Sequence, residues 1–517
     1  MKRQLLKWLP PLPLIFPALL SGALLSAAFP PIALGGITFV ALIPLIVSLY
    51  RKPWTRGEAF RAGFFFGLIF FLLLLWWIVK LLPWANVTIP WLMTPALILL
   101  VLYLSLYPAF FCLLLVTIGR GKLAPGFFVA PALWTLLEII RSRGELGFPW
   151  GVIGYGLSRH VNFIQGAAWV GLFGVGFIVV LISFVFSAAF VQREIFRKIV
   201  FLAVGAGMVA ALGLHGWKVA SGFPLEEHAR EVSVAVIQPN VSLKIKWDPA
   251  FRDSILSLTE RLSRIAASAN PGLIIFPETS APVYIHYEKE VKKLLTSLVR
   301  DIDTPIYIGF LDARRDWPDK NLNIYNSSGL FTPDGRLEKY DKTHLLPFGE
   351  ALPLSWKFRF LKKINFGQAN FQPGKLAPPI DSRIGSLGPL ICFESIFPEL
   401  SRRYARAGAD FFVNITNDGW FGNSPGPYQH AEMCVFRAVE NRRYLLRSAN
   451  TGVSMVVNPV GSVASALEMD REGMLVEKVR AIKGQTFYTR AGEWPVVIAS
   501  LLLLIIGAVV ARRSLKT

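Results

Sequence analysis

Long apolar segments recur along the chain, and they constrain its fold more than any other feature. Eight of them reach the length of about 20 residues that crosses a hydrocarbon core; they lie near 12–29, 32–50, 60–80, 92–118, 123–141, 163–190, 196–216 and 494–511. With 53% hydrophobic and 17% charged residues, the composition is too apolar for a purely soluble protein. The sequence therefore predicts seven spans, a long mixed region and an eighth span.

The first apolar segment has two interpretations. Basic residues precede it and small residues end it, as in a cleavable signal peptide. A second apolar segment follows almost at once, which favours an uncleaved membrane anchor.

Positive charge gathers in alternate loops. If the N-terminus is inside, the inside segments carry Lys2, Arg3, Lys7, Arg51, Lys52, Arg56, Arg61, Arg120, Lys122, Arg193, Arg197, Lys198, Arg512, Arg513 and Lys516. The short outside loops carry only Lys80, Arg141, Arg143 and Arg159. By the positive-inside rule, seven spans from an inside start place the long mixed region outside the cytoplasm. The net charge of +20 then reflects membrane orientation, and a nucleic-acid partner is implausible.

Few charges lie within the predicted spans, and Glu138 is the clearest. A transporter usually needs several ionisable groups inside the membrane, whereas Glu138 has two arginines close by, Arg141 and Arg143. We expect one of these to pair with it near the interface. We expect Cys112, in an apolar stretch, to be a buried hydrophobe.

Cysteine and histidine usage excludes several classes of protein. The three cysteines form no CxxC pair and are too few for a disulfide framework, and the six histidines show no HExxH spacing. We expect neither a metal nor a cofactor. Cys434 shares a helical face with Ala431 and Ala438, which predicts core packing.

The region from 222 to 488 alternates strand-like and helix-like segments, which predicts a layered α/β domain. We therefore expect three parts: a transmembrane domain of seven spans over residues 1–221, the α/β domain over 222–488, and the eighth span with a cytoplasmic tail over 489–517. We expect strands at 232–239, 273–278, 306–312, 322–332, 337–345, 387–392, 409–418, 444–450 and 454–461, and helices at 248–269, 288–302, 398–408 and 429–443. Pro333-Asp334-Gly335 marks a hairpin turn.

Three reactive side chains stand at the ends of predicted strands: Glu278, Lys342 and Cys392. Loops at such positions often carry function. A thiolate attacks a carbonyl, a carboxylate accepts the thiol proton, and a fixed ammonium stabilises the oxyanion. Spacing alone is weak support, and on that basis a solvated hairpin lysine is the favoured explanation of Lys342.

Several motifs strengthen this hypothesis by resemblance. They are PET at 277–279, YDKTHLLPFGE at 340–350, LICFES at 390–395 and NITNDGWFG at 414–422, with QH at 429–430 and RSANTG at 447–452. Together they resemble the carbon–nitrogen hydrolase (nitrilase) superfamily and, within it, the apolipoprotein N-acyltransferases of bacterial inner membranes. The resemblance covers the whole chain, because the plan of seven spans, a domain and an eighth span is also theirs. It implies an α-β-β-α sandwich for the domain.

The resemblance also implies roles for single residues. Glu278 corresponds to the general base, Lys342 to the oxyanion-stabilising lysine and Cys392 to the nucleophile. Four further positions correspond to supporting or substrate-binding residues: Trp247 on a mobile arm, Glu350 as a second essential carboxylate, Phe393, and Glu394. At Phe393 the family usually has Tyr, so a role for that hydroxyl is in doubt.

Each supporting position has a simpler explanation. Glu350 is also placed to pair with a base such as Lys357, and Trp247 to cover the preceding strand. We expect structural hydrogen bonding for His344 and His430. We expect Arg442 and Arg443 to form an ordinary solvated or salt-bridged face.

The implied reaction is N-acylation of the N-terminal diacylglyceryl-cysteine of apolipoproteins, with a membrane phospholipid as acyl donor and a Cys392 thioester as intermediate. The implied setting is the bacterial inner membrane, with the catalytic domain in the periplasm and a monomeric enzyme. Two alternatives remain: a membrane-tethered amidase that hydrolyses small amides, and a transporter or receptor whose outer domain only binds ligand. The sequence does not identify the preferred headgroup or acyl chain, or the route by which substrates reach the site.

The segment between Glu350 and Gly374 mixes apolar and basic residues. It contains Leu352, Leu354, Trp356, Phe358, Phe360, Ile364, Phe366 and Phe371, interleaved with Lys357, Arg359, Lys362 and Lys363. Such a segment suits a loop at the headgroup boundary. A buried loop of the domain core is an equally good interpretation.

Overall fold

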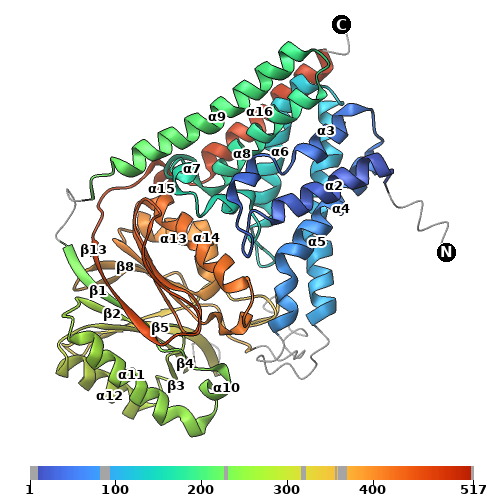
Figure 1. Ribbon diagram of the computed structural model, residues 1–517. Helices are drawn as coiled ribbons and strands as arrows, with labels where there is room; N and C mark the ends of the chain where they lie inside the picture. The colour runs from blue at the N-terminus through green and yellow to red at the C-terminus, as the bar shows by residue number, and fades with distance from the viewer. Residues whose placement is uncertain are drawn as a thin grey trace. The chain divides into compact units, whose positions relative to one another are not determined.

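We analysed a computed structural model of the chain (Figure 1), which describes residues 10–81, 93–225, 231–315, 322–354, 358 and 369–513. The chain divides into two compact units. One comprises Met1–Val79, Trp91–Gly222 and Ala491–Thr517; the other comprises Lys80–Pro90 and Phe223–Arg490. Each unit is described separately below.

The first unit is helical. Within the described residues, six helices are long and apolar enough to cross a membrane: α4 (Arg56–Leu75) with its continuation η2 (Trp76–Leu81), α5 (Met93–Gly119), α6 (Leu123–Arg141), α8 (Ala167–Val191), α9 (Ile195–Ser221) and α16 (Trp494–Arg513). They coincide with six of the eight predicted spans. The other two coincide with the shorter α2 (Leu12–Ser26) and with η1 (Gly35–Phe39) plus α3 (Ile43–Arg51). The number of spans therefore stays a prediction.

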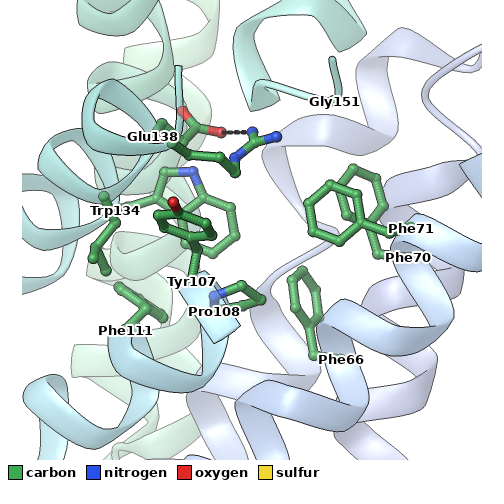
Figure 2. Close-up of a pocket in the computed structure, with 11 residues that line it drawn as sticks. Phe66, Phe70, Phe71, Tyr107, Pro108, Phe111, Trp134, Glu138 and Gly151 are labelled. Carbon is green, nitrogen blue, oxygen red and sulfur yellow. Dashed lines mark ion pairs between the residues drawn. The ribbon is translucent and has the colours of Figure 1, made fainter. Parts of the chain in front are cut away.

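Glu138 lies at a small aromatic cavity inside this unit. The cavity measures about 30 Å³, and Figure 2 shows Phe66, Phe70 and Phe71 across it from Trp134 and Glu138. The expected pairing is confirmed for Arg141, whose guanidinium lies 3.8 Å from the carboxylate, while Arg143 pairs with Glu493 at 3.1 Å.

The Glu138 pair also stabilises an irregular segment. The carboxylate accepts a hydrogen bond from Ile153 N, and Arg141 donates to the carbonyls of Phe148 and Trp150. Non-helical backbone at membrane depth needs such partners. Cys112 is fully buried, as expected.

The second unit contains two sheets. The order of the seven-stranded sheet is β13 (Gly473–Arg480), β1 (Glu231–Gln238), β2 (Leu273–Ile275), β4 (Ile306–Arg314), β5 (Asn323–Phe331) and β6 (Leu337–Asp341), with β3 (Ala281–Tyr284) also paired to β4. The order of the six-stranded sheet is β12 (Val463–Leu467), β11 (Ser454–Val457), β10 (Tyr444–Ala449), β9 (Phe411–Thr416), β8 (Gly385–Ile391) and β7 (Ile380–Ser382).

Helices cover the outer faces of both sheets (Figure 1). Against the first sheet lie α11 (Arg252–Ala267) and α12 (Lys289–Asp301), whose apolar stripes enter the core through Leu262, Leu295 and Leu298. Against the second lie α13 (Pro398–Arg406) and α14 (Gly426–Asn441). Hydrogen bonds such as Ser448 Oγ to the Ile237 carbonyl, at 2.7 Å, join the two sheets. The α-β-β-α sandwich implied by the resemblance is confirmed.

Some elements differ from the sequence prediction. The strand predicted over 273–278 ends at Ile275, and the edge strand β13, which closes the first sheet against β1 in antiparallel register, was not predicted. The expectation of a solvated face at Arg442-Arg443 is wrong. Arg443 is 3% exposed and donates to the carbonyls of Ala409 and Gly484, because it lies in the short connection between α14 and β10.

Candidate active site

Glu278 lies in the turn that follows β2. Its Oε2 accepts a hydrogen bond from Asn417 N at 2.9 Å, and its Oε1 accepts one from Asn326 Nδ2 at 2.7 Å. The turn lies directly on Gly309 of β4, where a Cβ atom would come within 2.8 Å of the Glu278 Cα. A residue with a side chain at 309 would therefore displace the carboxylate.

Lys342 directly follows β6, and it is buried. Its side chain is 1% exposed, and Nζ lies 2.8 Å from Glu350 Oε2 and 3.8 Å from Glu278 Oε1. The alternative of a solvated hairpin lysine is therefore wrong. The hairpin has turned the side chain inward between two carboxylates.

Glu350 is held on three sides. Besides Lys342, it accepts hydrogen bonds from Leu346 N at 2.8 Å and from Asn326 Nδ2 at 2.8 Å. The partner suggested as an alternative, Lys357, lies outside the described residues. Asn326 thus spans both carboxylates from the middle of β5.

Cys392 begins the short helix η8 (Cys392–Ile396) at the end of β8. Its φ of 52° is in the left-handed region, which costs a residue with a side chain about 1–3 kcal/mol. The carbonyl of Cys392 accepts hydrogen bonds from Ser395 Oγ at 2.9 Å and His430 Nε2 at 3.2 Å, which hold this conformation. The strained turn leaves the thiol half-buried at the site.

The charges of the three residues act on one another. Burial raises the pKa of the Cys392 thiol above its ordinary value and the Glu278 carboxylate raises it further, while Lys342 opposes the shift. Burial also raises the pKa of Glu278, which Lys342 lowers and Glu350 raises. The structure thus brings Glu278, Lys342 and Cys392 into one site, in which the thiol stays protonated until a neighbouring base accepts its proton.

The electrostatic state of Lys342 is set by its neighbours. Burial alone would lower the pKa of its ammonium, but Glu350, Cys392 and Glu278 together raise that pKa above its ordinary value. Lys342 therefore remains a cation throughout the physiological range. A fixed cation beside a thiol suits the stabilisation of an oxyanion.

Glu394 accepts hydrogen bonds from two separate segments of the chain. Its Oε1 accepts hydrogen bonds from the Tyr340 hydroxyl at 2.7 Å and from the main-chain N–H groups of Thr343 at 2.7 Å and His344 at 3.0 Å. Its Oε2 accepts one from Ile391 N at 2.8 Å. The carboxylate therefore joins the segment that follows Lys342 to the strand that carries Cys392.

A buried polar cluster supports the turn at Cys392. The Asp418 carboxylate lies 2.6 Å from Arg447 and 2.9 Å from His430 Nδ1, and all three side chains are fully buried. Although burial raises the pKa of Asp418, Arg447 and His430 lower it to about 2. His430 is thus structural, as expected.

The remaining predicted residues lie at the edges of the site. Phe393 is buried and packs edge-to-face on Phe397, so it is part of the core. Trp247 follows α10 (Leu243–Lys246) and is 42% exposed, so its ring is not enclosed. Cys434 is buried as predicted and contacts the His430 carbonyl.

Most of the predicted loop from 350 to 374 lies outside the described residues. This applies to Trp356, Lys357, Arg359, Phe360, Lys362, Lys363, Ile364 and Phe366. Leu352 is buried, whereas Leu354 and Phe358 are 38% and 43% exposed. Both interpretations of the loop therefore stay open.

Sequence reasoning missed Asn326 and Lys246 at this site. Asn326 stands in a strand of mixed polarity, and Lys246 is the second lysine of the run KIK. Neither position has a distinguishing pattern. Both are identified only by their contacts with Glu278.

An α-β-β-α sandwich with glutamate, lysine and cysteine at one site places the domain in the carbon–nitrogen hydrolase class. The family model described as carbon-nitrogen hydrolase matches residues 233–484, and the one described as apolipoprotein N-acyltransferase N-terminal domain matches residues 21–185. The apolipoprotein N-acyltransferase of Geobacter metallireducens is 36% identical over 486 residues, which is 92% of this chain and 91% of that protein. This chain belongs to the apolipoprotein N-acyltransferase family and is a membrane-embedded acyltransferase.

The apolipoprotein N-acyltransferase of Bradyrhizobium diazoefficiens is 32% identical over 522 residues, 96% of this chain and 95% of that protein. Among solved structures, the carbon–nitrogen hydrolase of Helicobacter pylori G27 is 18% identical with a TM-score of 0.39, over 52% of this chain and 95% of that chain.

Proposed function

We propose that this protein transfers an acyl chain from a membrane phospholipid to the N-terminal amine of the diacylglyceryl-cysteine of apolipoproteins, through a thioester on Cys392. The observation that carries the proposal is the convergence of Cys392, Glu278 and Lys342 in one half-buried site. Membership of the acyltransferase family supports the class of reaction, and the names of the relatives support the lipoprotein acceptor.

In the first half-reaction, Glu278 accepts the thiol proton and the Cys392 sulfur attacks the ester carbonyl of the phospholipid. Lys342 stabilises the negative charge on the carbonyl oxygen in the tetrahedral intermediate. When the intermediate collapses, the ester C–O bond breaks and Glu278 returns the proton to the departing oxygen. The products are a lysophospholipid and an acyl thioester.

In the second half-reaction, the free amine of the diacylated cysteine attacks the thioester carbonyl. Glu278 accepts a proton from the amine, Lys342 again stabilises the oxyanion, and the C–S bond breaks. The proton then returns to sulfur, which restores the Cys392 thiol. A thioester divides one difficult exchange into two easier steps.

The setting is part of the proposal. The enzyme lies in the bacterial inner membrane, with residues 1–221 and 489–517 in the membrane and the catalytic domain, 222–488, in the periplasm. The alternation of basic residues between loops supports this orientation. Because Glu278, Lys342 and Cys392 all come from one chain, we propose a monomer.

The deciding experiment separates the two half-reactions. Purified enzyme mixed with phospholipid alone should gain a fatty-acyl mass on the peptide that contains Cys392, and neutral hydroxylamine should remove it. Added diacylated lipopeptide should discharge the acyl group and appear as triacylated product. Release of free fatty acid without triacylated product would instead support the amidase alternative, and the absence of both would support a domain that only binds ligand.

Variants of two cysteines locate the nucleophile. Cys392→Ala should form no adduct, while Cys392→Ser should form an acyl ester that discharges poorly, because an alkoxide is a poorer leaving group than a thiolate. Cys434→Ala removes a buried thiol away from the reacting atoms and should retain the adduct with modest loss of stability. An adduct on Cys434, or product from Cys392→Ala, would reject the mechanism.

A further inference from the structure

A second buried lysine, Lys246, contacts the main chain of the proposed general base, Glu278. Lys246 ends α10, is 3% exposed, and donates a hydrogen bond from Nζ to the main-chain oxygen of Glu278 at 2.8 Å. Lys244, two residues earlier on the same short helix, is exposed. The burial of Lys246 is therefore specific to its position.

Burial of this ammonium is costly, and that cost needs a compensating interaction. A lysine removed from water loses its hydration and shifts toward the neutral form unless negative charge lies close. Burial lowers the pKa of Lys246 to about 8, and the Glu278 charge opposes this shift. At neutral pH Lys246 is therefore a cation beside Glu278.

The charge of Glu278 and the charges that act on it balance when Lys246 is counted. Glu278 and Glu350 contribute two negative charges, while Lys342 contributes one positive charge. Lys246 supplies the second positive charge. Transfer of the thiol proton from Cys392 to Glu278 then leaves the total unchanged at zero.

Lys246 also connects the base to a neighbouring segment of the chain. The residues before α10 are fixed to the second sheet, because Asn450 accepts a hydrogen bond from Val241 N at 3.0 Å and donates one to the Val241 carbonyl at 2.7 Å. The exposed Trp247 follows Lys246 directly. The Glu278 turn is thus held by Asn417 on one side and by Lys246 on the other.

We infer that Lys246 is a positioning residue for the acyl transfer: its ammonium fixes the Glu278 main chain and balances the two carboxylates, so that Glu278 accepts the Cys392 proton at neutral pH. The inference rests on the proposed function for the identity of the reaction. Its own content is a statement about Glu278 and Cys392, which is testable without lipid.

The neighbouring charged groups define what a pH experiment measures. Those that act on Glu278 are Lys342, Glu350 and Lys246, and those that act most on Cys392 are Glu278, Lys342 and Asp418. Substitution of Lys246 by a neutral residue leaves all the others in place. Without the Lys246 charge the pKa of Glu278 rises, so Glu278 accepts the Cys392 proton only at higher pH.

The experiment measures the rate at which iodoacetamide alkylates Cys392 between pH 5.5 and 9.5, with the purified full chain and mass detection of the Cys392 peptide. The alkylation rate should rise with pH, and the pH range of this rise is called the acid limb. In Lys246→Met the acid limb should move up by about one pH unit, and the alkylation rate at neutral pH should fall about tenfold. The difference should narrow above about pH 8, since wild-type Lys246 itself loses its charge there. Lys246→Arg should restore the wild-type limb, and Lys244→Met should match the wild type.

Lys246→Gln separates the effect of the lysine charge from that of its hydrogen bond to Glu278. It also replaces Lys246→Met as the neutral variant if Lys246→Met does not fold. Gln retains a donor for the Glu278 carbonyl but no charge, so it should show the same displaced limb. A wild-type profile in both neutral variants would overturn the inference, as would a loss of rate that is equal at every pH. A missing acyl adduct in the wild type would reject the proposed function but leave this result standing.

Discussion

Lys342 Nζ lies 2.8 Å from Glu350 Oε2, in a pair whose side chains are only 1% and 12% exposed. Removal of one member of such a buried pair typically costs about 3–5 kcal/mol, because the other charge is left uncompensated. Glu350 thus holds Lys342 in place and raises the pKa of its ammonium. In the proposed reaction, this pair gives Glu350 a supporting role without contact to a reacting atom.

The first prediction concerns this pair. Glu350→Gln should lower turnover by about 10²–10⁴-fold, a range typical of groups that support proton transfer. Lys342 would lose its closest negative charge and its fixed position, so the oxyanion would be less stabilised. The formation of triacylated lipopeptide under saturating substrates measures this loss.

Glu338 is the matched control for Glu350. It is also a carboxylate near Lys342 in sequence, but its side chain is 37% exposed and pairs only at 3.7 Å with Arg336. Glu338→Gln should keep nearly full turnover. Equal activity of the two variants would reject the role assigned to Glu350.

The second prediction concerns Asn326, whose amide donates to both Glu278 and Glu350. Asn326→Asp would replace this donor by a third carboxylate and raise the pKa of Glu278, so acylation by phospholipid alone should fall by at least about tenfold at pH 7. Asn323→Asp, earlier on the same strand, should acylate normally. Unchanged acylation in Asn326→Asp would show that the amide is dispensable.

The sequence predicted the large elements of both units, because their signals are strong. Apolar runs predict helices such as α5 and α16, and β-branched runs predict strands such as β1 and β9. The motifs likewise indicate Glu278, Lys342 and Cys392, which the folded domain brings into one site. At α2 and α3 the predicted spans stay untested, because the apolar helices there are shorter than the other six.

What the sequence did not predict depends on contacts between distant residues. Asn326 and Lys246 approach Glu278 only after β5 and α10 have packed, from 48 and 32 residues away. The buried Arg443 was mistaken for a solvated residue because charge in a sequence usually indicates exposure. Its hydrogen bonds to main-chain carbonyls become apparent only in the folded domain.

The third prediction concerns pH. Burial raises the pKa of Glu278 above the ordinary value of 4.5, and Glu278 acts as a base only when deprotonated. The rate of Cys392 acylation should therefore rise with pH, and the midpoint of this rise should lie above pH 4.5. Single-turnover rates with phospholipid alone, measured across this range, check the expectation, and a midpoint at or below 4.5 would contradict it.

The fourth prediction concerns the buried cluster below the nucleophile. Asp418→Asn would leave Arg447 without its anionic partner, which should destabilise the domain by about 3–5 kcal/mol. Because the pKa of Asp418 is lowered to about 2, its contribution to stability is present above the ordinary pKa of Asp and is lost as the pH falls toward 2. Thermal unfolding of the purified variant at neutral pH measures the loss, with the exposed Asp303→Asn as control; an unchanged midpoint would contradict the prediction.

The fifth prediction concerns orientation. If the catalytic domain is periplasmic, a cysteine introduced at Lys478, whose side chain is 74% exposed on the domain, should react in intact cells with a maleimide that crosses only the outer membrane. A cysteine at Arg193, in the exposed connection between α8 and α9, should react only after lysis. A Cys392→Ser background removes the half-buried thiol, while Cys112 and Cys434 are fully buried.

Each position serves as the control for the other in this experiment. Basic residues cluster in the loops assigned to the inside, which include Arg193, Arg197 and Lys198, and seven spans from an inside start bring the domain to the other side. If six spans preceded the domain and the N-terminus were inside, the pattern would be reversed. Arg193→Cys would then react in intact cells, and Lys478→Cys would react only after lysis. Labelling of Arg193→Cys in intact cells together with protection of Lys478→Cys would therefore reject the proposed orientation. Either pattern requires that α9 spans the membrane between the two reporters, and labelling of both in intact cells would reject that span.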